Sequence, residues 1–422
     1  MEFLFRGEKM NKYFDVKDKV YDITEKYPET IEVFVANGFE PLANEKMRKL
    51  MGKTISLEMA CKSKKVNLEL FTEKLIEAIE QNRKSVDSTL IVNKEDINAD
   101  VRIEGVLPCP VRVPLLEGFN TWIEENKEKL QLNIEYDLKS AHMGVDWLRE
   151  KIEPGNEDSL ADIYLSAGFD LFFDKDLMGK FRENGVFEDI TGLEKLNEDF
   201  DNEKIDLKDP EKQYSIIGGV PAVFMVNTEE LKGRDFPRTW GDLLKPEFEG
   251  SVSIPTMDND LFNAILLNIY KIYGEEGIRK LGRAQFRSMH PAEMVRSHIR
   301  KNNSDVPTVT IMPYFFTNMV RPDSPLKAQW PEDGTIISPI FLLAKKKTKE
   351  KTKPIIDYIF SKEVGDLLSN NGKFPTTIPG VDNRLSPEQK FIWLGWDYIK
   401  SNNIGELIEN CMKLFHEVKQ EE

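Results

Sequence analysis

The spacing of apolar residues along the chain changes near residue 100. Before this point apolar residues recur at helical spacing, for example at Leu68, Phe71, Leu75 and Ile79, which places them on one face of a helix. After it, short apolar runs alternate with amphipathic stretches. Strands that alternate with helices predict a parallel sheet with right-handed crossovers. The pattern therefore predicts an all-helical N-terminal part followed by a larger α/β part.

The first strands of the α/β part are predicted over residues 102–107, 132–138 and 161–166, with helices over 115–123 and 145–152 between them. In such sheets ligands bind beyond the carboxyl ends of the strands. These ends carry three short segments: Pro108-Cys109-Pro110, Ser140-Ala141-His142 and Ser166-Ala167-Gly168-Phe169. The sequence therefore predicts that ligand contacts come from these segments.

Further apolar stretches continue the α/β pattern. A long run spans Tyr214–Asn227, and helices are predicted over residues 261–272, 274–281 and 291–300. Residues 335–344 have the composition of a buried strand. After Pro354, apolar residues at helical spacing predict a helix that ends at Asn370-Asn371-Gly372.

Two motifs of this part resemble a known family. Pro331-Glu332-Asp333-Gly334, an apolar strand, a Lys-rich turn and a helix ending near Gly372-Lys373-Phe374-Pro375 resemble the C-terminal part of extracellular solute-binding proteins of ABC importers, particularly the iron(III)-type group. The turn Pro237-Arg238-Thr239-Trp240-Gly241-Asp242-Leu243 is similar to one common in that family. The resemblance covers about three quarters of the chain.

The resemblance implies an α/β, two-lobed type II periplasmic-binding-protein-like fold preceded by a small all-helical domain. It implies that Tyr214–Asn227 crosses from the first lobe into the second. The expected divisions are a helical domain, a linker, the first part of lobe 1, lobe 2, and a return to lobe 1 with C-terminal helices, over residues 13–82, 83–100, 101–212, 213–310 and 311–422.

The helical domain resembles a small domain of unknown function (DUF1858-like) often found beside redox or metal proteins. Ser56 and Asn67 are expected to cap two of its helices. Relatives of that domain often have a Cys-containing turn, whereas Gly38-Phe39-Glu40-Pro41-Leu42 contains no cysteine. A docking or regulatory role is therefore expected in preference to catalysis, with a protein as its partner.

The chain of 422 residues has a formal charge of −15 and a pI near 5.1. This charge argues against non-specific binding to nucleic acid or anionic lipid, although local basic patches stay open. No apolar run is long enough to cross a bilayer, and residues 1–9 do not resemble a secretory signal. Three widely spaced cysteines fit a reducing compartment. We expect a cytoplasmic protein, exported only if a leader has been removed.

The first wall of the expected ligand site contains Cys109, Arg112, Ser140, His142, Ser166 and Gly168. Arg112 and nearby backbone N–H groups could bind an anion, or the segment could be a rigid turn with Arg112 in a surface ion pair. Cys109 could face the ligand or pack as a small apolar residue. Small residues around Gly168 permit close approach to the backbone, as a tight turn would also require.

The second wall contains Thr256, Asp258, His290 and Tyr314. Thr256 and Asp258 either line the site or cap the following helix, and His290 has the same two interpretations. His290 and His298 lack a third metal ligand at suitable spacing, so no metal or cofactor is expected. The iron(III) group uses paired tyrosines, whereas Tyr314 is followed by Phe315 and Phe316, which disfavours ferric ion.

The function expected from the resemblance is a non-enzymatic solute-binding protein whose lobes close on a small, anionic ligand. Two alternatives stay open: an enzyme on the same fold, and an intracellular sensor whose N-terminal helices report closure to a partner. The enzyme is disfavoured because the sequence contains no Ser-His-Asp, P-loop or zinc-hydrolase motif. Neither nucleic-acid binding nor membrane insertion is expected.

Overall fold

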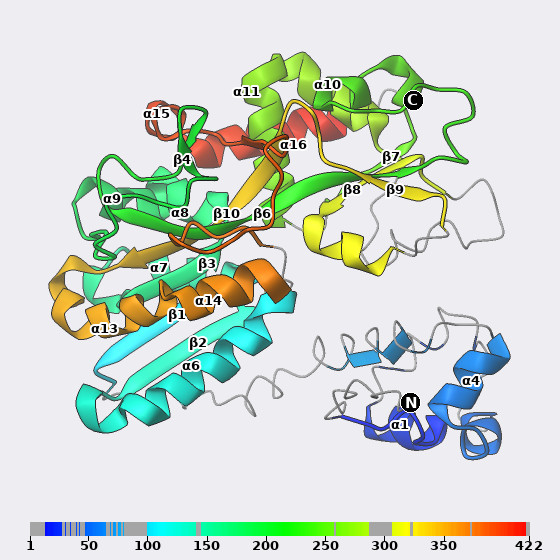
Figure 1. Cartoon of the computed structure of the whole chain (residues 1–422), viewed down its shortest axis with the longest axis horizontal. Helices are drawn as coiled ribbons and strands as arrows, with labels where there is room; N and C mark the ends of the chain where they lie inside the picture. Colours follow the sequence, from blue (N-terminus) through cyan, green and yellow to red (C-terminus); the bar gives the residue numbers. More distant parts are fainter. Residues whose placement is uncertain are drawn as a thin grey trace, which may run out of the picture. The chain divides into compact units, whose positions relative to one another are not determined.

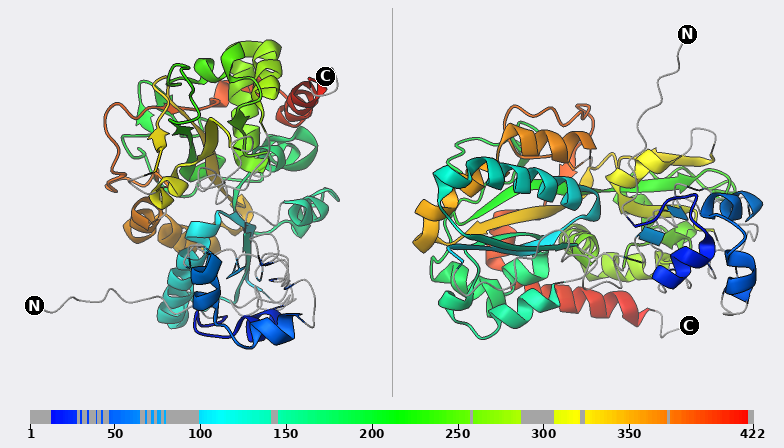
Figure 2. Two further views of the ribbon diagram at one scale, coloured as in Figure 1. Left: turned by 90° about the vertical axis from the view of Figure 1, so that its right-hand side faces the viewer. Right: turned by 90° about the horizontal axis from the view of Figure 1, so that it is seen from below.

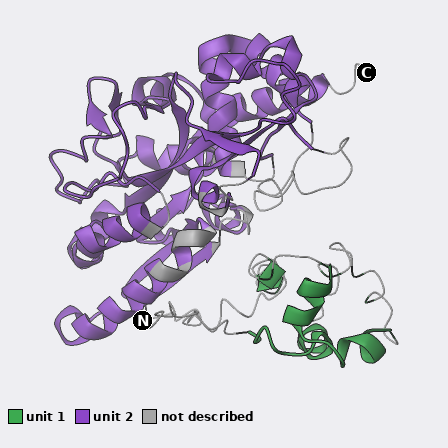
Figure 3. Ribbon diagram, turned by 45° about the vertical axis from the view of Figure 1, so that its right-hand side comes forward, with its two compact units in different colours: residues 1–93 green, residues 94–422 purple. Residues whose placement is uncertain are grey.

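The computed structural model describes residues 13–27, 30, 34, 39, 42, 47–64, 68, 71–72, 75–76, 79, 99–140, 145–256, 259–286, 306–320, 324–371 and 374–418. The chain divides into two compact units, residues 1–93 and residues 94–422 (Figure 3). Each unit has its own apolar core, and the two are described separately below. No helix among the described residues combines the length and the apolar character that crossing a bilayer requires.

The small unit contains α1 (Val20–Lys26), the π-helical turn η2 (Arg48–Gly52) and α4 (Leu57–Lys64). Backbone hydrogen bonds join them, since the Val20 N–H donates to the Ile55 carbonyl over 3.1 Å. The Ser56 hydroxyl accepts from the Met59 N–H at 3.3 Å, so its predicted role as a cap is confirmed. Asn67 lies outside the described residues.

In the described part of the large unit, nine strands form one mixed sheet in the order β2-β1-β3-β10-β6-β8-β7, with β11 beside β10 and β9 beside β6 (Figure 1). Strands β1, β2 and β3 are parallel, as predicted, and β10 runs antiparallel to both β3 and β6. The bounds are β1 Val101–Leu107, β2 Ile134–Ser140, β3 Ile163–Ala167, β6 Tyr214–Asn227, β7 Val252–Ser253, β8 Val309–Pro313, β9 Leu326–Gln329, β10 Thr335–Ala344 and β11 Phe391–Ile392. A separate hairpin pairs β4 (Asp201–Asn202) with β5 (Ile205–Asp206).

Strand β6 belongs to both halves of this sheet. Residues 214–221 pair with β10, residues 222–226 pair with β8, and residues 224–227 also pair with β9. All fourteen residues of β6 are buried. The prediction of a single strand that crosses between two lobes is confirmed. We call the part around β1, β2 and β3 the first lobe and the part around β7, β8 and β9 the second lobe.

Helices cover both faces of the sheet (Figure 2). The longer helices are α6 Cys109–Leu130, α7 Asp146–Ile152, α11 Asn259–Ala284, α13 Lys349–Ile359, α15 Trp396–Ser401 and α16 Ile404–Glu417. Shorter helices and turns are η4 Glu157–Ser159, α8 Phe169–Phe173, η5 Lys175–Gly179, α9 Lys180–Glu183, α10 Trp240–Leu243, η6 Pro246–Phe248, η9 Tyr314–Met319, η10 Lys346–Thr348, α14 Lys362–Asp366 and η11 Leu367–Asn371.

Three helix predictions need correction. Helix α6 begins at Cys109, six residues before the predicted start, because Pro110 is tolerated in a first turn whose N–H groups have no intrahelical acceptor. The helix predicted after Pro354 is two helices, since Ser361 caps α14 by accepting from the Val364 N–H. Helix α11 spans two predicted helices, with a kink at Gly274, whose φ of +66° suits glycine. The helix predicted over 291–300 lies outside the described residues.

The apolar core follows the two faces of the sheet. One cluster joins the first-lobe strands to α6 and α13, with Ile103, Leu116 and Ile356 fully buried. A larger cluster joins the opposite face of β10 and β6 to α8, α11 and α16. Because the larger cluster includes Phe172 of α8 and Phe262 of α11, it connects both lobes behind the crossing strands.

Candidate ligand-binding site

The carboxyl ends of the first-lobe strands lie at one edge. Leu107, the last residue of β1, pairs with Ser140, the last residue of β2. Ala167, the last residue of β3, pairs with Ile340 of β10, and Ile340 pairs in turn with Gly218 of β6. The first-lobe edge therefore lies level with Gly218.

The carboxyl ends of the second-lobe strands form a second edge. β7 and β8 are parallel, and Pro313, the last residue of β8, pairs with Ala222 of β6. Thr256 follows β7 by three residues, and Tyr314 follows β8 directly. The second-lobe edge therefore lies level with Ala222.

The strand directions make these two edges face each other. β3 and β6 are both antiparallel to β10, so β3 points along β6 toward the second lobe, whereas β8 is antiparallel to β6 and points toward the first. The two edges are four residues apart on β6, which corresponds to about 13 Å at the usual rise of a strand. Ligands of open α/β sheets bind beyond the carboxyl ends of the strands, and here two such sets of ends face each other.

Helix α6 starts at the first-lobe edge. Its first residue, Cys109, lies two residues after the end of β1, and the predicted turn Pro108-Cys109-Pro110 is therefore the beginning of this helix. The N–H groups of a first helical turn have no intrahelical acceptor and carry partial positive charge. The start of a helix of 22 residues at this edge favours an anion there.

Arg112 lies beneath this edge, on the second turn of α6. Its Nε–H donates to the Leu138 carbonyl of β2 over 2.6 Å, and the side chain is 9% exposed. The alternative in which Arg112 lies on the surface is therefore wrong, because its side chain is buried against the sheet. Arg112 is fixed next to the carboxyl end of β2, and contact with a ligand stays a prediction.

Ser166 and Gly168 shape the end of β3. The Ser166 hydroxyl accepts from the Val106 N–H at 3.1 Å and donates to the Ala167 carbonyl at 2.9 Å, so it joins β1 to β3. Gly168 has a φ of +129° immediately before α8, a conformation that glycine tolerates best. Both residues therefore have structural roles at the predicted edge.

The other predicted residues differ in what the structure describes of them. Ser140 ends β2, but its side chain and that of Cys109 lie outside the described parts. Thr256 is half-buried, and its N–H donates to the Ile254 carbonyl over 2.8 Å. The three remaining predicted residues, His142, Asp258 and His290, fall outside the described residues, so their contribution stays a prediction.

The aromatic residues after β8 divide between the lobes. The Tyr314 ring makes an edge contact with Trp330, with centroids 5.3 Å apart, within a small second-lobe cluster. The Phe315 ring stacks on Phe374, with centroids 6.3 Å apart, and packs against the first-lobe core. The aromatic turn therefore joins the two lobes beside the edges.

The comparisons with known proteins agree with this architecture. A family model described as "Bacterial extracellular solute-binding protein" matches residues 158–402. The chain belongs to this family. A second model, for a domain of unknown function (DUF1858), matches residues 14–72 of the small unit.

This solute-binding protein is similar to "Spermidine/putrescine-binding periplasmic protein 1" of Haemophilus influenzae, with 21% identity over 273 residues that cover 61% of this chain and 75% of the relative. The family description and this name refer to extracellular or periplasmic proteins, so the comparisons give no support to the cytoplasmic expectation.

Solved structures of low identity show the fold. The ferric binding protein from Campylobacter jejuni has a TM-score of 0.52 and 15% identity, covering 76% of this chain and 99% of that protein. Apo ferric ion-binding protein A of Pasteurella haemolytica has a TM-score of 0.54 and 15% identity, with coverage of 76% and 97%. AfuA from Actinobacillus pleuropneumoniae, bound to fructose-6-phosphate, has a TM-score of 0.50 and 16% identity, with coverage of 75% and 98%. The two-lobed periplasmic-binding fold implied by the resemblance is confirmed.

Sequence reasoning missed one segment at the centre of the solute-binding protein. The segment from Phe374 to Thr377 runs beside β6, where the Gly219 N–H donates to the Pro375 carbonyl over 3.0 Å and the Thr376 hydroxyl donates to the Ile217 carbonyl over 2.6 Å. A Cβ at Gly218 would lie 2.7 Å from the Pro375 carbonyl oxygen. The paired glycines of β6, noted in the sequence only as interruptions, allow this approach.

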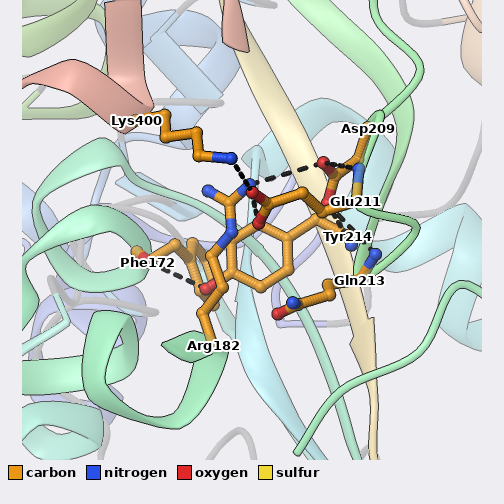
Figure 4. Close-up of polar contacts among 7 residues, drawn as sticks. All are labelled: Phe172, Arg182, Asp209, Glu211, Gln213, Tyr214 and Lys400. Carbon is orange, nitrogen blue, oxygen red and sulfur yellow. Dashed lines mark hydrogen bonds and ion pairs between the residues drawn. The ribbon is translucent and has the colours of Figure 1, made fainter. Parts of the chain in front are cut away.

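A charged cluster at the opposite end of the first lobe was also missed (Figure 4). Arg182 of α9 lies 3.4 Å from Asp209 and 3.3 Å from Glu211, and Lys400 of α15 lies 2.6 Å from Glu211. Burial raises the pKa of the neighbouring Tyr214 far above its ordinary value. Leu343 pairs with Tyr214 and with Tyr164, near the amino end of β3, so the cluster lies away from the facing edges. It attaches α15 to the first lobe.

Among the described residues, no group of three or more His, Cys, Asp or Glu side chains could hold a metal ion. The buried thiols of Cys61 and Cys411 belong to separate units, and burial raises the pKa of Cys61 to about 11 and that of Cys411 to about 12. Neither thiol has the low pKa of a reactive cysteine.

Proposed function

We propose that the two lobes close on a small, anionic organic solute held between the facing strand ends. The observation that carries the proposal is that β3 and β8 point toward each other and end level with Gly218 and Ala222 of β6. The start of α6 at the first edge adds backbone N–H groups and a favourable dipole for negative charge. Closure of the lobes would exclude water and strengthen these interactions.

The proposed ligand contacts come from both edges. Arg112 supplies a positive charge that its bond to Leu138 holds in place, and Gly168 permits close approach to the backbone. Tyr314 supplies an aromatic wall from the second lobe. The complete proposed set is Cys109, Arg112, Ser140, His142, Ser166, Gly168, Thr256, Asp258, His290 and Tyr314.

The proposal includes a non-enzymatic role outside the cytoplasm. The family and the named relatives are binding proteins, and their names refer to the periplasm or the extracellular space. Some structural neighbours are named for ferric ion and one relative for polyamines. Against ferric ion, Tyr314 is followed by Phe315, whose ring packs on Phe374 and supplies no phenolate ligand.

A thermal-shift screen tests the proposal with organic acids, phosphorylated metabolites, oxyanions, ferric citrate, polyamines and neutral solutes. A ligand of the folded state at a hundred times its Kd stabilises by about 2.7 kcal/mol, so a true hit should raise the Tm clearly. We expect an organic anion to give the shift. A polyamine hit, or a ferric hit with a phenolate absorption band lost in Tyr314→Phe, would contradict the proposal.

The hit is then compared between variants. Arg112→Lys and Tyr314→Ala should reduce the ligand-induced shift relative to the Tm of each unliganded variant. The matched control is Arg102→Lys, because Arg102 also donates to a backbone carbonyl, that of Leu160 at 3.0 Å, but lies near the other end of β1. A shift that survives both site variants would place the ligand elsewhere.

A further inference from the structure

The small unit differs from the large unit in charge. Residues 1–93 contain 16 Lys and Arg and 16 Asp and Glu, so the entire formal charge of −15 belongs to residues 94–422. Within the small unit, the described stretch 47–64 contains one acidic residue, Glu58, and five basic ones: Arg48, Lys49, Lys53, Lys62 and Lys64. This stretch is therefore a basic segment in an acidic chain.

The same stretch exposes large apolar side chains. Leu50 is 69% exposed, Met51 41% and Met59 58%, and they are three of the five exposed large hydrophobic residues in the described parts of the chain. The other two, Ile272 and Tyr273, lie on α11 of the large unit. Exposed apolar side chains that lie together and are surrounded by polar residues mark protein or membrane interaction sites, and Leu50 and Met51 are neighbours in the chain.

The turn that carries Leu50 and Met51 is held from its inner side. A Cβ at Gly52 would lie 2.9 Å from the Tyr21 nitrogen, which shows how closely η2 packs on α1. Arg48 donates to the Leu42 carbonyl at 2.8 Å, and the Thr54 hydroxyl donates to the Met51 carbonyl at 2.7 Å. The approach of Gly52 to Tyr21 and the bond from Arg48 to Leu42 thus hold the turn on the small unit, and the bond from Thr54 closes its C-terminal end.

We propose that residues 48–64 form a docking surface for an anionic phospholipid bilayer. Protein interfaces are depleted in lysine, whereas four of the five basic residues here are lysines. Lysines beside exposed apolar side chains suit a bilayer surface, where the apolar groups enter the headgroup region and the ammonium groups meet phosphates. The docking is peripheral.

The attraction depends on charges close to the bilayer. Electrostatic interactions are screened over about 8 Å at physiological ionic strength, so the basic residues of 48–64 act on the phosphates only when they lie next to the bilayer surface. Each basic residue near an anionic leaflet strengthens binding about fivefold. Because a single apolar or basic signal gives only weak binding, the surface requires both kinds of residue.

The test is sedimentation of the full chain with vesicles of phosphatidylcholine alone or of equal parts phosphatidylcholine and phosphatidylglycerol. We expect retention on the anionic vesicles, weakened by salt, and none on the neutral ones. Lys49→Glu with Lys53→Glu should weaken binding by about 25-fold or more, because two charges are reversed. Leu50→Ser with Met51→Ser should weaken it without changing the charge.

The matched control is Lys346→Glu with Lys347→Glu, which reverses two exposed lysines of η10 in the large unit. Unchanged far-UV circular dichroism and Tm would show that the variants fold. The proposal would be overturned if the full chain did not bind anionic vesicles or bound neutral vesicles equally well. It would also be overturned if the control variant lost as much binding as the variant of Lys49 and Lys53. If the variant of Lys49 and Lys53 does not fold, the variant of Leu50 and Met51 decides: undiminished binding to anionic vesicles by that variant would overturn the proposal.

Discussion

The backbone N–H of Trp240 donates to the side-chain carboxylate of Asp333, 3.0 Å from its Oδ2 atom. The Trp240 indole N–H donates to the carbonyl oxygen of Gly334, the residue after Asp333, over 2.9 Å. The two family-like motifs, separated by more than ninety residues in the chain, therefore form one joined pair of turns. Asp333 caps the start of α10 from outside that helix, while Thr239 and Asp242 form a capping box within it.

Loss of this carboxylate should destabilise the large unit. Asp333→Ala leaves the N–H of Trp240, a residue that is 1% exposed, without its acceptor, at an expected cost of about 1–3 kcal/mol in the free energy of unfolding. The control is Glu332→Ala, which removes an exposed ion pair with Arg238 at an expected cost of about 0–1 kcal/mol. Urea unfolding of both variants makes the comparison, and equal losses would contradict the assigned role.

Gly105 of β1 should tolerate no side chain. A Cβ there would lie 1.9 Å from the Leu165 carbonyl oxygen of β3, so Gly105→Ala must push the two strands apart where Ser166 joins them. We expect the free energy of unfolding to fall by about 3 kcal/mol or more, which is at or above the upper end of the usual cost of overpacking a core. Gly250→Ala is the control, since its positive φ costs about 1–2 kcal/mol but nothing lies within 4 Å of the new Cβ. A smaller loss for Gly105→Ala than for Gly250→Ala in denaturant unfolding would contradict this explanation.

The sequence predicted the strands better than their surroundings. Tyr214–Asn227 and Thr335–Ala344 were predicted with the observed bounds, because both are continuous apolar runs with buried residues throughout. The start of α6 was missed because proline is tolerated in the first turn of a helix, and the division between α13 and α14 was missed because it depends on the local cap at Ser361. Apolar periodicity does not encode those ends.

The candidate site was harder to predict than the fold. The predicted parallel direction of the strands placed Ser166 and Gly168 at the carboxyl end of β3, where the structure also has them. The burial of Arg112 against Leu138 depends on which helix face meets the sheet, and the approach of Pro375 to Gly218 joins residues far apart in the chain. Such contacts are set by tertiary packing, which a single sequence does not reveal.

The large unit should fold without the small one. Residues 94–422 form a compact unit with its own core, and the segment predicted as a linker shows no continuous apolar stripe. A fragment that begins near Asp100 should therefore be soluble and melt cooperatively, with the same ligand-induced shift as the full chain. The fragment should include Asp100, because the Lys351 ammonium lies 3.0 Å from the Asp100 carboxylate. An insoluble fragment without a cooperative transition would show that the boundary is wrong.

The charged cluster around Glu211 should make stability depend on pH in a defined direction. The hydrogen bond from Lys400, followed by the charge of Arg182, lowers the pKa of Glu211 below its ordinary value of 4.5. Because the pKa of Glu211 is lower in the folded state than in the unfolded state, ionised Glu211 stabilises the folded protein. This stabilisation is fully present above pH 4.5 and is lost as the pH falls through the folded-state pKa.

Lys400→Met should remove part of this acid sensitivity and cost at most about 1 kcal/mol at neutral pH, because the lysine is 69% exposed and its attraction is screened by water. Arg182→Met should cost more, about 3–5 kcal/mol, since it leaves the fully buried carboxylate of Asp209 without its ion-pair partner. Urea unfolding between neutral pH and pH values below 4.5 measures both effects. If Lys400→Met cost as much as Arg182→Met, or left the acid dependence unchanged, the attachment of α15 would not depend on Glu211 as described.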